Sequence, residues 1–396
     1  NTLSGKEKNR ILKEMAQALR ANTLVLLEEN AKDMSDGKKN NLTSALMDRL
    51  FLDEGRVEGM AVAVEEIAAL KEPVGRILEG WITEDGLKIE KVSIPIGVIG
   101  IIYESRPNVT SDTAALCFKS SNVCVLKGGK EAENSNKAIA NVLQDVLEKN
   151  KLPRALIALI PDSSREGVNK LIKMDKYVDL IIPRGGAGLI KHVSDNATVS
   201  VVKHDKGQCN TYIDKDAKLD NAIAIAINAK VQRPGVCNAM ETLLVDRAIA
   251  ATALPRLKAA FDAAHTELKG CLETQAIIEV KHASDEDYDT EYLANILNIK
   301  VVSGVEGAIE HIVRFTSGHS EAIITENISA AETFLNAIDA AVVYVNASTR
   351  FTDGGAFGFG AEVGISTNKL HARGPMGIEG LTTYKFKIYG SGQVRA

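Results

Sequence analysis

The chain has 396 residues, of which 45% are hydrophobic, and a formal net charge of −5 at pH 7. This length predicts two domains, each with its own core. The 47 Lys and Arg residues are mixed along the chain with 52 Asp and Glu residues, so no basic surface for nucleic acid or an acidic membrane is expected. Five scattered cysteines without metal-ligand spacing argue against a disulfide framework and against a zinc site, and we expect a cytoplasmic protein without a membrane span.

The first part of the chain is predicted to be helical and the next part extended. Ile11 and Met15 are typical of the apolar face that recurs at helical spacing through residues 1–70. Asp85-Gly86 lies between two loosely alternating apolar segments, which predicts a β-hairpin. The apolar run that follows, residues 96–103, indicates a buried strand.

Short apolar strands then alternate with helices, which is typical of a parallel sheet covered by helices. The predicted strands are residues 122–127, 155–160, 178–182 and 198–202, with helices that include residues 134–149 and 165–174. A second α/β set has predicted strands at residues 241–245, 299–302, 321–325 and 341–345. The aromatic tail, residues 380–390, is predicted to be an edge strand that needs a partner.

Cys237 stands in a loop, residues 232–239, between a helix of small residues and the strand at 241–245. A thiol in such a loop is a candidate nucleophile, because a nearby cation such as Arg233 favours the reactive thiolate. The alternative is a buried, inert cysteine, since free cysteine is among the residue types most often buried.

Two glycine segments after predicted strands indicate a dinucleotide site. Lys127 precedes Gly128-Gly129, and Gly185 and Gly186 lead into a helix. Glycines let a backbone approach phosphate, a helix N-terminus favours an anion, and Lys can pair with a ribose 2′-phosphate. Neither segment is the GxGxxG fingerprint, and glycine turns after strands are common in α/β folds.

The order of these features resembles the aldehyde dehydrogenase superfamily. It is carried by Lys127, the Gly-Gly turn at 185–186, Gly-x-Cys at 235–237 and Glu-x-Leu at 291–293. The blocks at residues 103–110, 234–243 and 369–377 resemble the branch of that superfamily that reduces glutamyl phosphate, and the similarity runs essentially the full length.

The resemblance implies an α/β, aldehyde-dehydrogenase-like fold with three parts. A Rossmann-type NADPH-binding domain would comprise residues 1–79 and 96–230, and an α/β catalytic domain residues 231–379. Residues 80–95 and 380–396 would form a small β oligomerisation element. A homo-oligomer, dimer or tetramer, is therefore expected, and glutamate 5-kinase is a candidate partner.

The activity implied by the resemblance is the NADPH-dependent reduction of L-glutamyl 5-phosphate to L-glutamate 5-semialdehyde and phosphate, the second step of proline biosynthesis from glutamate. Cys237 would form a thioester with the acyl group. The Asn108 amide and the Cys237 backbone N–H would stabilise the oxyanion, although Asn108 could instead be a turn residue after Pro107.

The same resemblance assigns the cofactor residues. Lys127 would meet the adenosine ribose, Gly185 and Gly186 would lie near the dinucleotide, and Glu291 would bind the nicotinamide ribose. The alternative for Glu291 is a solvated residue in the acidic run at 285–291.

By similarity to the superfamily, residues 346–350 should line the substrate entrance, with Ser348 and Arg350 as candidate substrate-binding residues. Arg106 and Arg373 are further candidates for binding the anionic ends of the substrate. A guanidinium pairs bidentately with carboxylate or phosphate, and the ordinary alternative for each arginine is a surface ion pair.

The segment His204-Asp205-Lys206-Gly207 departs from the family pattern. Aldehyde dehydrogenases place a glutamate base there, in Glu-Leu-Gly-Gly, to activate the water that hydrolyses the thioester. Without that carboxylate, phosphate can take the place of water in the reverse direction, which favours a phosphorylating reductase. A non-phosphorylating aldehyde dehydrogenase, with Asp205 as the base, and a non-catalytic assembly partner remain alternatives.

Overall fold

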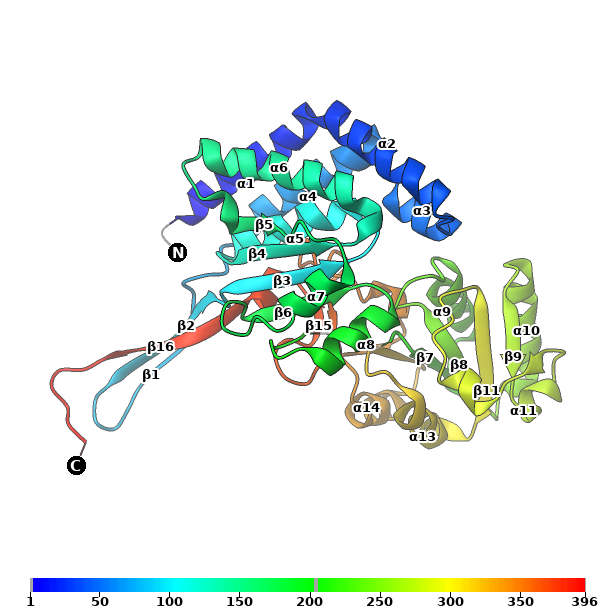
Figure 1. Cartoon of the computed structure of the whole chain (residues 1–396). Coiled ribbons are helices and arrows are strands. Elements are labelled where there is room, and N and C mark those ends of the chain that lie inside the picture. The colour runs from blue at the N-terminus through cyan, green and yellow to red at the C-terminus, as the bar shows by residue number, and fades with distance from the viewer. Residues whose placement is uncertain (1–2, 203–205, 396) are drawn as a thin grey trace. The chain divides into compact units, whose positions relative to one another are not determined.

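The computed structural model describes residues 3–202 and 206–395 and divides into two compact units (Figure 1). The first unit contains residues 1–203, 358–364 and 376–396, and the second contains residues 204–357 and 365–375.

A four-stranded parallel sheet forms the centre of the first unit, in the order β5-β4-β3-β6. Its strands are β3 (Val98–Tyr103), β4 (Val123–Gly128), β5 (Ile157–Leu159) and β6 (Leu180–Arg184). In the register of β3, Ile99 lies opposite Cys124 on one side and Leu180 on the other. The strands are rich in buried Val, Ile and Leu because helices cover both faces of a parallel sheet.

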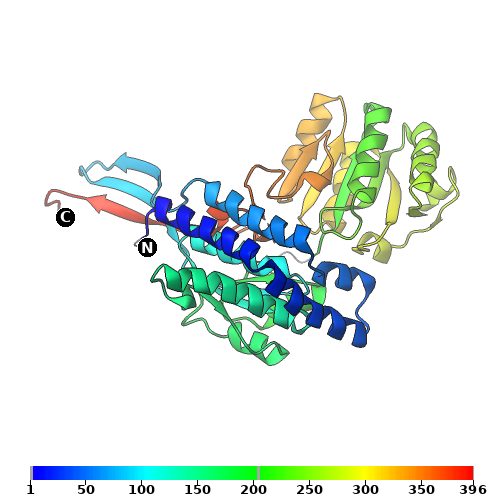
Figure 2. The same ribbon diagram turned by 90° about the horizontal axis from the view of Figure 1, so that it is seen from above.

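Helices cover the two faces of this sheet unequally, and Figures 1 and 2 show the longer ones side by side over one face. On that face lie α1 (Gly5–Ala21), α2 (Thr23–Lys39), α4 (Glu54–Ala69), α5 (Pro107–Lys119) and α6 (Glu133–Lys149), with the short α3 (Ser44–Leu50) after α2. The other face carries α7 (Arg165–Leu171) and α8 (Ala187–Asn196), which pack on Ile102 and Ile181. Short 3₁₀ turns are η1 (Lys130–Ala132), η2 (Arg154–Leu156) and η4 (Ile378–Leu381).

The predicted hairpin and the tail strand form one antiparallel sheet in the first unit, in the order β1-β2-β16. Its strands are β1 (Ile77–Ile82), β2 (Lys88–Pro95) and β16 (Thr382–Tyr389). Gly86 has a φ of +80°, a conformation that glycine adopts without strain, at the predicted turn. The tail strand therefore finds its partner, β2, within the same chain.

A seven-stranded parallel sheet forms the second unit, in the order β10-β9-β11-β8-β7-β12-β13. Its strands are β7 (Cys209–Ile213), β8 (Met240–Asp246), β9 (Glu267–Gly270), β10 (Lys281–His282), β11 (Ile296–Val302), β12 (Ser320–Ile324) and β13 (Val342–Val345). The helices are α9 (Leu219–Val231), α10 (Ala250–Ala263), α11 (Leu272–Gln275), α12 (Asp285–Tyr288), α13 (Gly304–Phe315) and α14 (Ile328–Ala337), followed by η3 (Thr349–Phe351). Two short strands, β14 (Gly364–Ser366) and β15 (Gly374–Met376), pair separately.

The two faces of this sheet bury separate cores. Leu243 packs with α9 and α10 on one face, whereas its neighbour Leu244 packs with α13 and α14 on the other. This alternation is the two-residue period of a β-strand, and Figure 1 shows the two pairs of helices on opposite sides of the sheet. None of the helices in the described part of the chain has the span of apolar residues that a bilayer crossing needs.

One expectation differs from the structure. Residues 198–202 are not a strand, because Val201 makes only an isolated bridge to Ile181. The two compact units divide near residue 203, and β7 pairs with β8 and β12 in the second sheet.

Candidate active site

Cys237 lies at the amino end of the second sheet, in the loop between α9 and β8. Its side chain is partly exposed and forms no disulfide. Amino ends of neighbouring parallel strands lie together, so the segment before β7 runs beside the cysteine loop. Cys237 therefore lies in a loop between a helix and a strand, as the sequence predicts, and its role as the nucleophile stays a prediction.

Gly207 supports the cysteine from that neighbouring segment. A Cβ atom at Gly207 would lie 2.1 Å from the carbonyl oxygen of Cys237 and 2.5 Å from its Cα. The Cys209 thiol donates to the same carbonyl oxygen at 3.3 Å. Burial raises the pKa of Cys209 well above its ordinary value, so this second cysteine stays a thiol and supports the loop.

Arg350 holds the cysteine loop at both ends. Its Nε donates to Gln232 Oε1 at 2.8 Å, and its guanidinium also donates to Asn238 Oδ1. The backbone N–H of Arg350 donates to Ser348 Oγ at 3.3 Å, which places Ser348 behind the arginine. Burial and the nearby Arg233 lower the pKa of Arg350, whereas Cys237 acts in the opposite direction. A guanidinium that interacts with this thiol favours its thiolate form.

Glu291 belongs to the same side of the second unit. Burial raises the pKa of its carboxyl group, against the lowering effects of the Gly207 N–H, Lys206 and Lys230. A half-buried carboxyl group in contact with Gly207 differs from the solvated residue of an acidic run.

A fully buried ion pair lies beneath the loop. Lys230 Nζ donates to Glu241 Oε2 at 2.7 Å, and both side chains are completely buried. The other carboxylate oxygen of Glu241 accepts from the backbone N–H of Leu293 at 3.4 Å. Burial raises the pKa of Glu241 to about 7 and lowers that of Lys230. The pair connects the last turn of α9, the start of β8 and the segment after Glu291. Sequence reasoning missed it, because lysine and glutamate are rarely fully buried.

Glu321 gives a pH-dependent prediction. It is fully buried, its Oε2 accepts from the Asn210 N–H at 2.9 Å, and burial raises its pKa to about 8. Because the folded pKa lies above the unfolded one, the contribution of Glu321 to stability is fully present below the unfolded pKa and is lost as pH rises toward 8, by about 1.4 kcal/mol per unit. We expect the melting temperature to drop between about pH 6 and about pH 8, and Glu321→Gln to flatten this drop. Differential scanning fluorimetry across this range measures it.

The exposed Glu332 serves as the control for this prediction, because Glu332→Gln should leave the pH curve of the wild type unchanged. Parallel curves for Glu321→Gln and the wild type would show that Glu321 does not titrate in this range.

Arg373 is engaged elsewhere. Its Nη2 donates to Asp339 Oδ1 at 2.6 Å and to the Asp339 carbonyl oxygen at 3.1 Å, and Lys369 also pairs with Asp339. In the structure Arg373 therefore forms an ion pair with Asp339, which is the ordinary alternative to a role in substrate binding.

In the first unit, Arg106 and Asn108 lie at the start of α5. Arg106 is the N-cap residue, and Pro107 is the first residue of the helix, where its missing N–H costs nothing. The exposed Asn108 amide donates to Asp112 Oδ2 at 2.9 Å. Burial raises the pKa of Asp112 to about 6, although Asn108, Ser111 and Arg184 lower it. Asn108 is therefore a helical residue and not a turn residue.

Lys127 lies buried at the end of β4. Its Nζ donates to the Gly128 carbonyl oxygen at 3.0 Å, and burial lowers its pKa against the attraction of Asp162, Glu131 and Glu133. Beside it, Gly128 and Gly129 line a small crevice at the carboxyl ends of β4 and β5, together with Glu133, Asn136, Lys137, Leu159, Ile160, Pro161 and Ser163. The crevice holds only about 20 Å³, so it is smaller than a nucleotide, and its lining combines glycine backbone with the Lys137 ammonium group, the Ser163 hydroxyl group and the Glu133 carboxylate.

Gly185 and Gly186 meet a carboxylate of the first unit itself. A Cβ atom at Gly185 would lie 2.5 Å from Glu104 Oε2, and the Gly186 N–H donates to that oxygen at 2.8 Å. The N-terminus of α8 therefore already has an anionic partner, which a phosphate would have to displace.

His204 and Asp205, where the family glutamate would stand, lie outside the described residues. Among residues 3–202 and 206–395, no group of three or more His, Cys, Asp or Glu side chains is arranged to hold a metal ion.

Comparison with known proteins identifies the family. Residues 1–283 match the aldehyde dehydrogenase family. The chain is 81% identical over 393 residues to the gamma-glutamyl phosphate reductase of Sulfurovum sp. and 79% identical to that of Sulfurimonas denitrificans, in each case over 99% of this chain and 96% of the relative. The crystal structure of gamma-glutamyl phosphate reductase from Thermotoga maritima matches with a TM-score of 0.98 and 47% identity, over 100% of this chain and 96% of that one.

The chain therefore belongs to the aldehyde dehydrogenase family, in its gamma-glutamyl phosphate reductase branch. The fold class and the family resemblance predicted from the sequence are both confirmed.

Proposed function

We propose that this chain, in the cytoplasm, reduces L-glutamyl 5-phosphate to L-glutamate 5-semialdehyde and phosphate with NADPH, in the second step of proline biosynthesis from glutamate. The observation that carries the proposal is a partly exposed Cys237 whose loop is bound by Arg350, in a chain 81% identical to a gamma-glutamyl phosphate reductase.

Cys237 begins the proposed reaction by attacking the acyl carbon of the substrate. A carbon–sulfur bond forms, the bond to the phosphate oxygen breaks, and phosphate leaves. Arg350 favours the thiolate that attacks. The Cys237 backbone N–H and the Asn108 amide would donate to the oxyanion of the tetrahedral intermediate.

The thioester is then reduced. When bound, NADPH supplies the hydride for this step. The resulting thiohemiacetal oxyanion collapses as its carbon–sulfur bond breaks, which releases the aldehyde and returns the Cys237 thiolate.

The cofactor would be held mainly by the first unit. Lys127 would meet the adenosine ribose, Gly185 and Gly186 would lie near the dinucleotide, and Glu291 of the second unit would bind the nicotinamide ribose. What supports this assignment is the position of Lys127 and the two glycines at the carboxyl end of β4, where parallel α/β sheets bind nucleotides. In this scheme residues 1–79 and 96–230 form the cofactor domain, and residues 231–379 form the catalytic domain. Of the first range, β7 and α9 belong to the second compact unit.

Arg106, Ser348, Arg350 and Arg373 would bind the carboxylate and phosphate ends of the substrate. The contacts of Arg350 with the cysteine loop support its place in this set. For Arg373, binding substrate would require giving up its pair with Asp339.

The reverse reaction tests the proposal: NADP⁺ reduction with glutamate semialdehyde, with and without inorganic phosphate. We expect turnover to require phosphate, and Cys237→Ala to lower kcat by roughly three orders of magnitude or more, because the nucleophile is lost. Phosphate-independent turnover would contradict the proposal and indicate a non-phosphorylating aldehyde dehydrogenase with a hidden base such as Asp205. Full activity in Cys237→Ala would indicate that the thiol plays no catalytic part.

We infer that the chain works as a homo-oligomer, dimer or tetramer, joined through the sheet β1-β2-β16. This sheet exposes large apolar side chains, including Ile82 at 72% and Ile388 at 58%. Ile82→Lys combined with Ile388→Lys is expected to yield a smaller species in light scattering after size exclusion, because buried charge opposes association. Leu272→Lys, at a residue 74% exposed in the second unit, is the control. An unchanged mass would contradict the inference. In a separate experiment, glutamate 5-kinase is added before size exclusion, and a species of larger mass would indicate a complex.

A further inference from the structure

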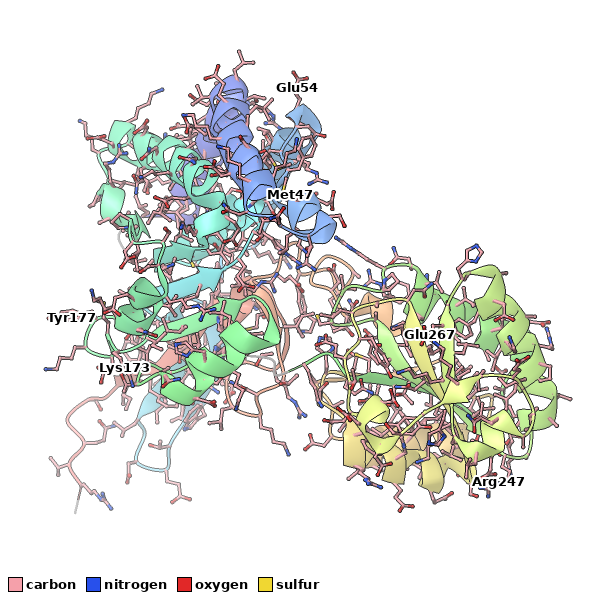
Figure 3. All side chains as sticks on the ribbon, turned by 45° about the vertical axis from the view of Figure 1, so that its right-hand side comes forward. Met47, Glu54, Lys173, Tyr177, Arg247 and Glu267 are labelled. Carbon is pink, nitrogen blue, oxygen red and sulfur yellow. The ribbon has the colours of Figure 1, made fainter. Side chains whose placement is uncertain are left out.

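A crevice of about 640 Å³ opens at the carboxyl ends of β7, β8 and β11. Cys237 precedes β8, so this crevice and the cysteine lie at opposite ends of the parallel sheet. Figure 3 labels Glu267, which begins β9, and Arg247, which follows β8, at those two ends of the second unit. The crevice is therefore separate from the candidate active site, and its volume is that of a small-molecule site.

The chain path explains why the sheet opens at this place. The chain passes from β7 to β8 through α9, which covers one face of the sheet. It later passes from β11 to β12 through α13, which covers the opposite face, and β12 lies on the other side of β7 from β8. Helices that leave for opposite faces separate at the carboxyl ends of β7 and β12. Such reversal points are where parallel α/β sheets bind ligands.

Two buried carboxylates meet one hydroxyl at the wall of the crevice. Asp214 and Asp246 are 3% and 4% exposed and both line it. The Tyr212 hydroxyl lies 3.1 Å from Asp214 Oδ2 and 2.8 Å from Asp246 Oδ2. A hydroxyl has one proton, so it serves only one of the two oxygens. No other described residue donates to either oxygen, which leaves the pair short of one donor that a ligand could supply.

Opposite charge is available nearer the solvent. Lys215 is exposed, lines the crevice and pairs with no described residue. Arg247 is already paired with Glu273 at 2.8 Å. The lining thus carries three carboxylates, Asp214, Asp246 and Glu306, and one unpaired cation, Lys215. This excess of negative charge repels the phosphate of a nucleotide and attracts a ligand that carries a positive charge.

We propose that this crevice binds an α-amino acid, with its ammonium group on Asp214 and Asp246 and its carboxylate toward Lys215. The volume leaves room for a side chain and for bridging water. The site goes beyond the proposed function, because it shares no residue with the thiol site.

Isothermal titration calorimetry with L-proline, a rigid α-amino acid, tests the proposal. Pyrrolidine has the amine without the carboxylate, and cyclopentanecarboxylate has the carboxylate without the amine. We expect L-proline to bind at millimolar concentration and each partial analogue to bind about tenfold more weakly or worse, because a charged hydrogen bond is lost. Asp246→Asn should weaken L-proline by a similar factor, whereas Asp220→Asn, at an exposed residue outside the crevice, should not.

The exposed Lys215 provides a variant that does not disturb a core. Lys215→Ala should weaken L-proline and leave pyrrolidine unchanged. Equal L-proline affinity in the wild type, Asp246→Asn and Lys215→Ala would overturn the proposal. If AMP bound more tightly than L-proline and Asp246→Asn abolished the binding of AMP, the crevice would be a nucleotide site and the proposal would be wrong. The absence of any L-proline binding would also overturn it. Activity in the reverse reaction is measured separately, so failure here leaves the proposed function untouched.

Discussion

Gly207→Ala is expected to lower kcat/KM by about a hundredfold or more, because it displaces the cysteine loop. The added methyl carbon would lie 2.1 Å from the Cys237 carbonyl oxygen, 2.5 Å from its Cα and 2.6 Å from its carbonyl carbon. All three are backbone atoms, so no side-chain rotation relieves the collision and either β7 or the loop must move. A movement of this size misplaces the thiol relative to its substrate. Steady-state kinetics of the reverse reaction and the alkylation rate of Cys237 measure the effect.

Gly59→Ala is the matched control for this prediction. Gly59 lies in α4, and a Cβ atom there meets nothing within 4 Å. Alanine favours a helix more than glycine does, so this variant should keep full activity and gain up to about 1 kcal/mol of stability. A folded Gly207→Ala enzyme with the kinetics and alkylation rate of the wild type would contradict the predicted collision.

Local sequence signals predicted the elements that depend on neighbours in the chain. The turn at Asp85-Gly86 gave the hairpin, because a glycine with positive φ suffices to reverse the chain. The loop position of Cys237 followed from a helix of small residues on one side and an apolar strand on the other. Arg350 entered only through the family resemblance, and its bonds to Gln232 and Asn238 join residues more than a hundred positions apart.

Features that depend on residues far apart in the chain could not be predicted from the local sequence. Residues 209–213 read as polar, with Asn210 and Thr211 in the middle, yet β7 is buried because it lies between β8 and β12. Gly207 stands two residues before β7, and a glycine beside a strand can mark a close backbone approach. Its role becomes visible only when the Cys237 backbone is placed against it.

The Lys230–Glu241 pair should make the two single variants respond to pH in opposite directions. Lys230→Met leaves a buried carboxyl group whose pKa burial already raises to about 7, so this variant is most stable where the group is protonated and loses stability as pH rises. Glu241→Gln leaves a buried ammonium group whose pKa burial lowers, so this variant loses stability as pH falls. Each loss should reach about 3–5 kcal/mol, because breaking a buried pair leaves an uncompensated charge.

Urea denaturation at about pH 6 and about pH 9 measures both slopes, and the double variant Lys230→Met with Glu241→Leu completes a double-mutant cycle. We expect the double variant to be more stable than the sum of the single losses predicts, since it removes both charges and fills the space with apolar side chains. Lys258→Met, which breaks an exposed pair with Asp262, should cost less than about 1 kcal/mol at either pH. If both buried variants lost stability in the same direction of pH, the two groups would not be charged partners. Lys230 lies before Cys237 and Glu241 lies after it, so the coupling energy from the cycle would measure how strongly this pair joins the two segments that flank the cysteine. Glu241 also accepts from the Leu293 N–H, which extends the connection to the segment after Glu291.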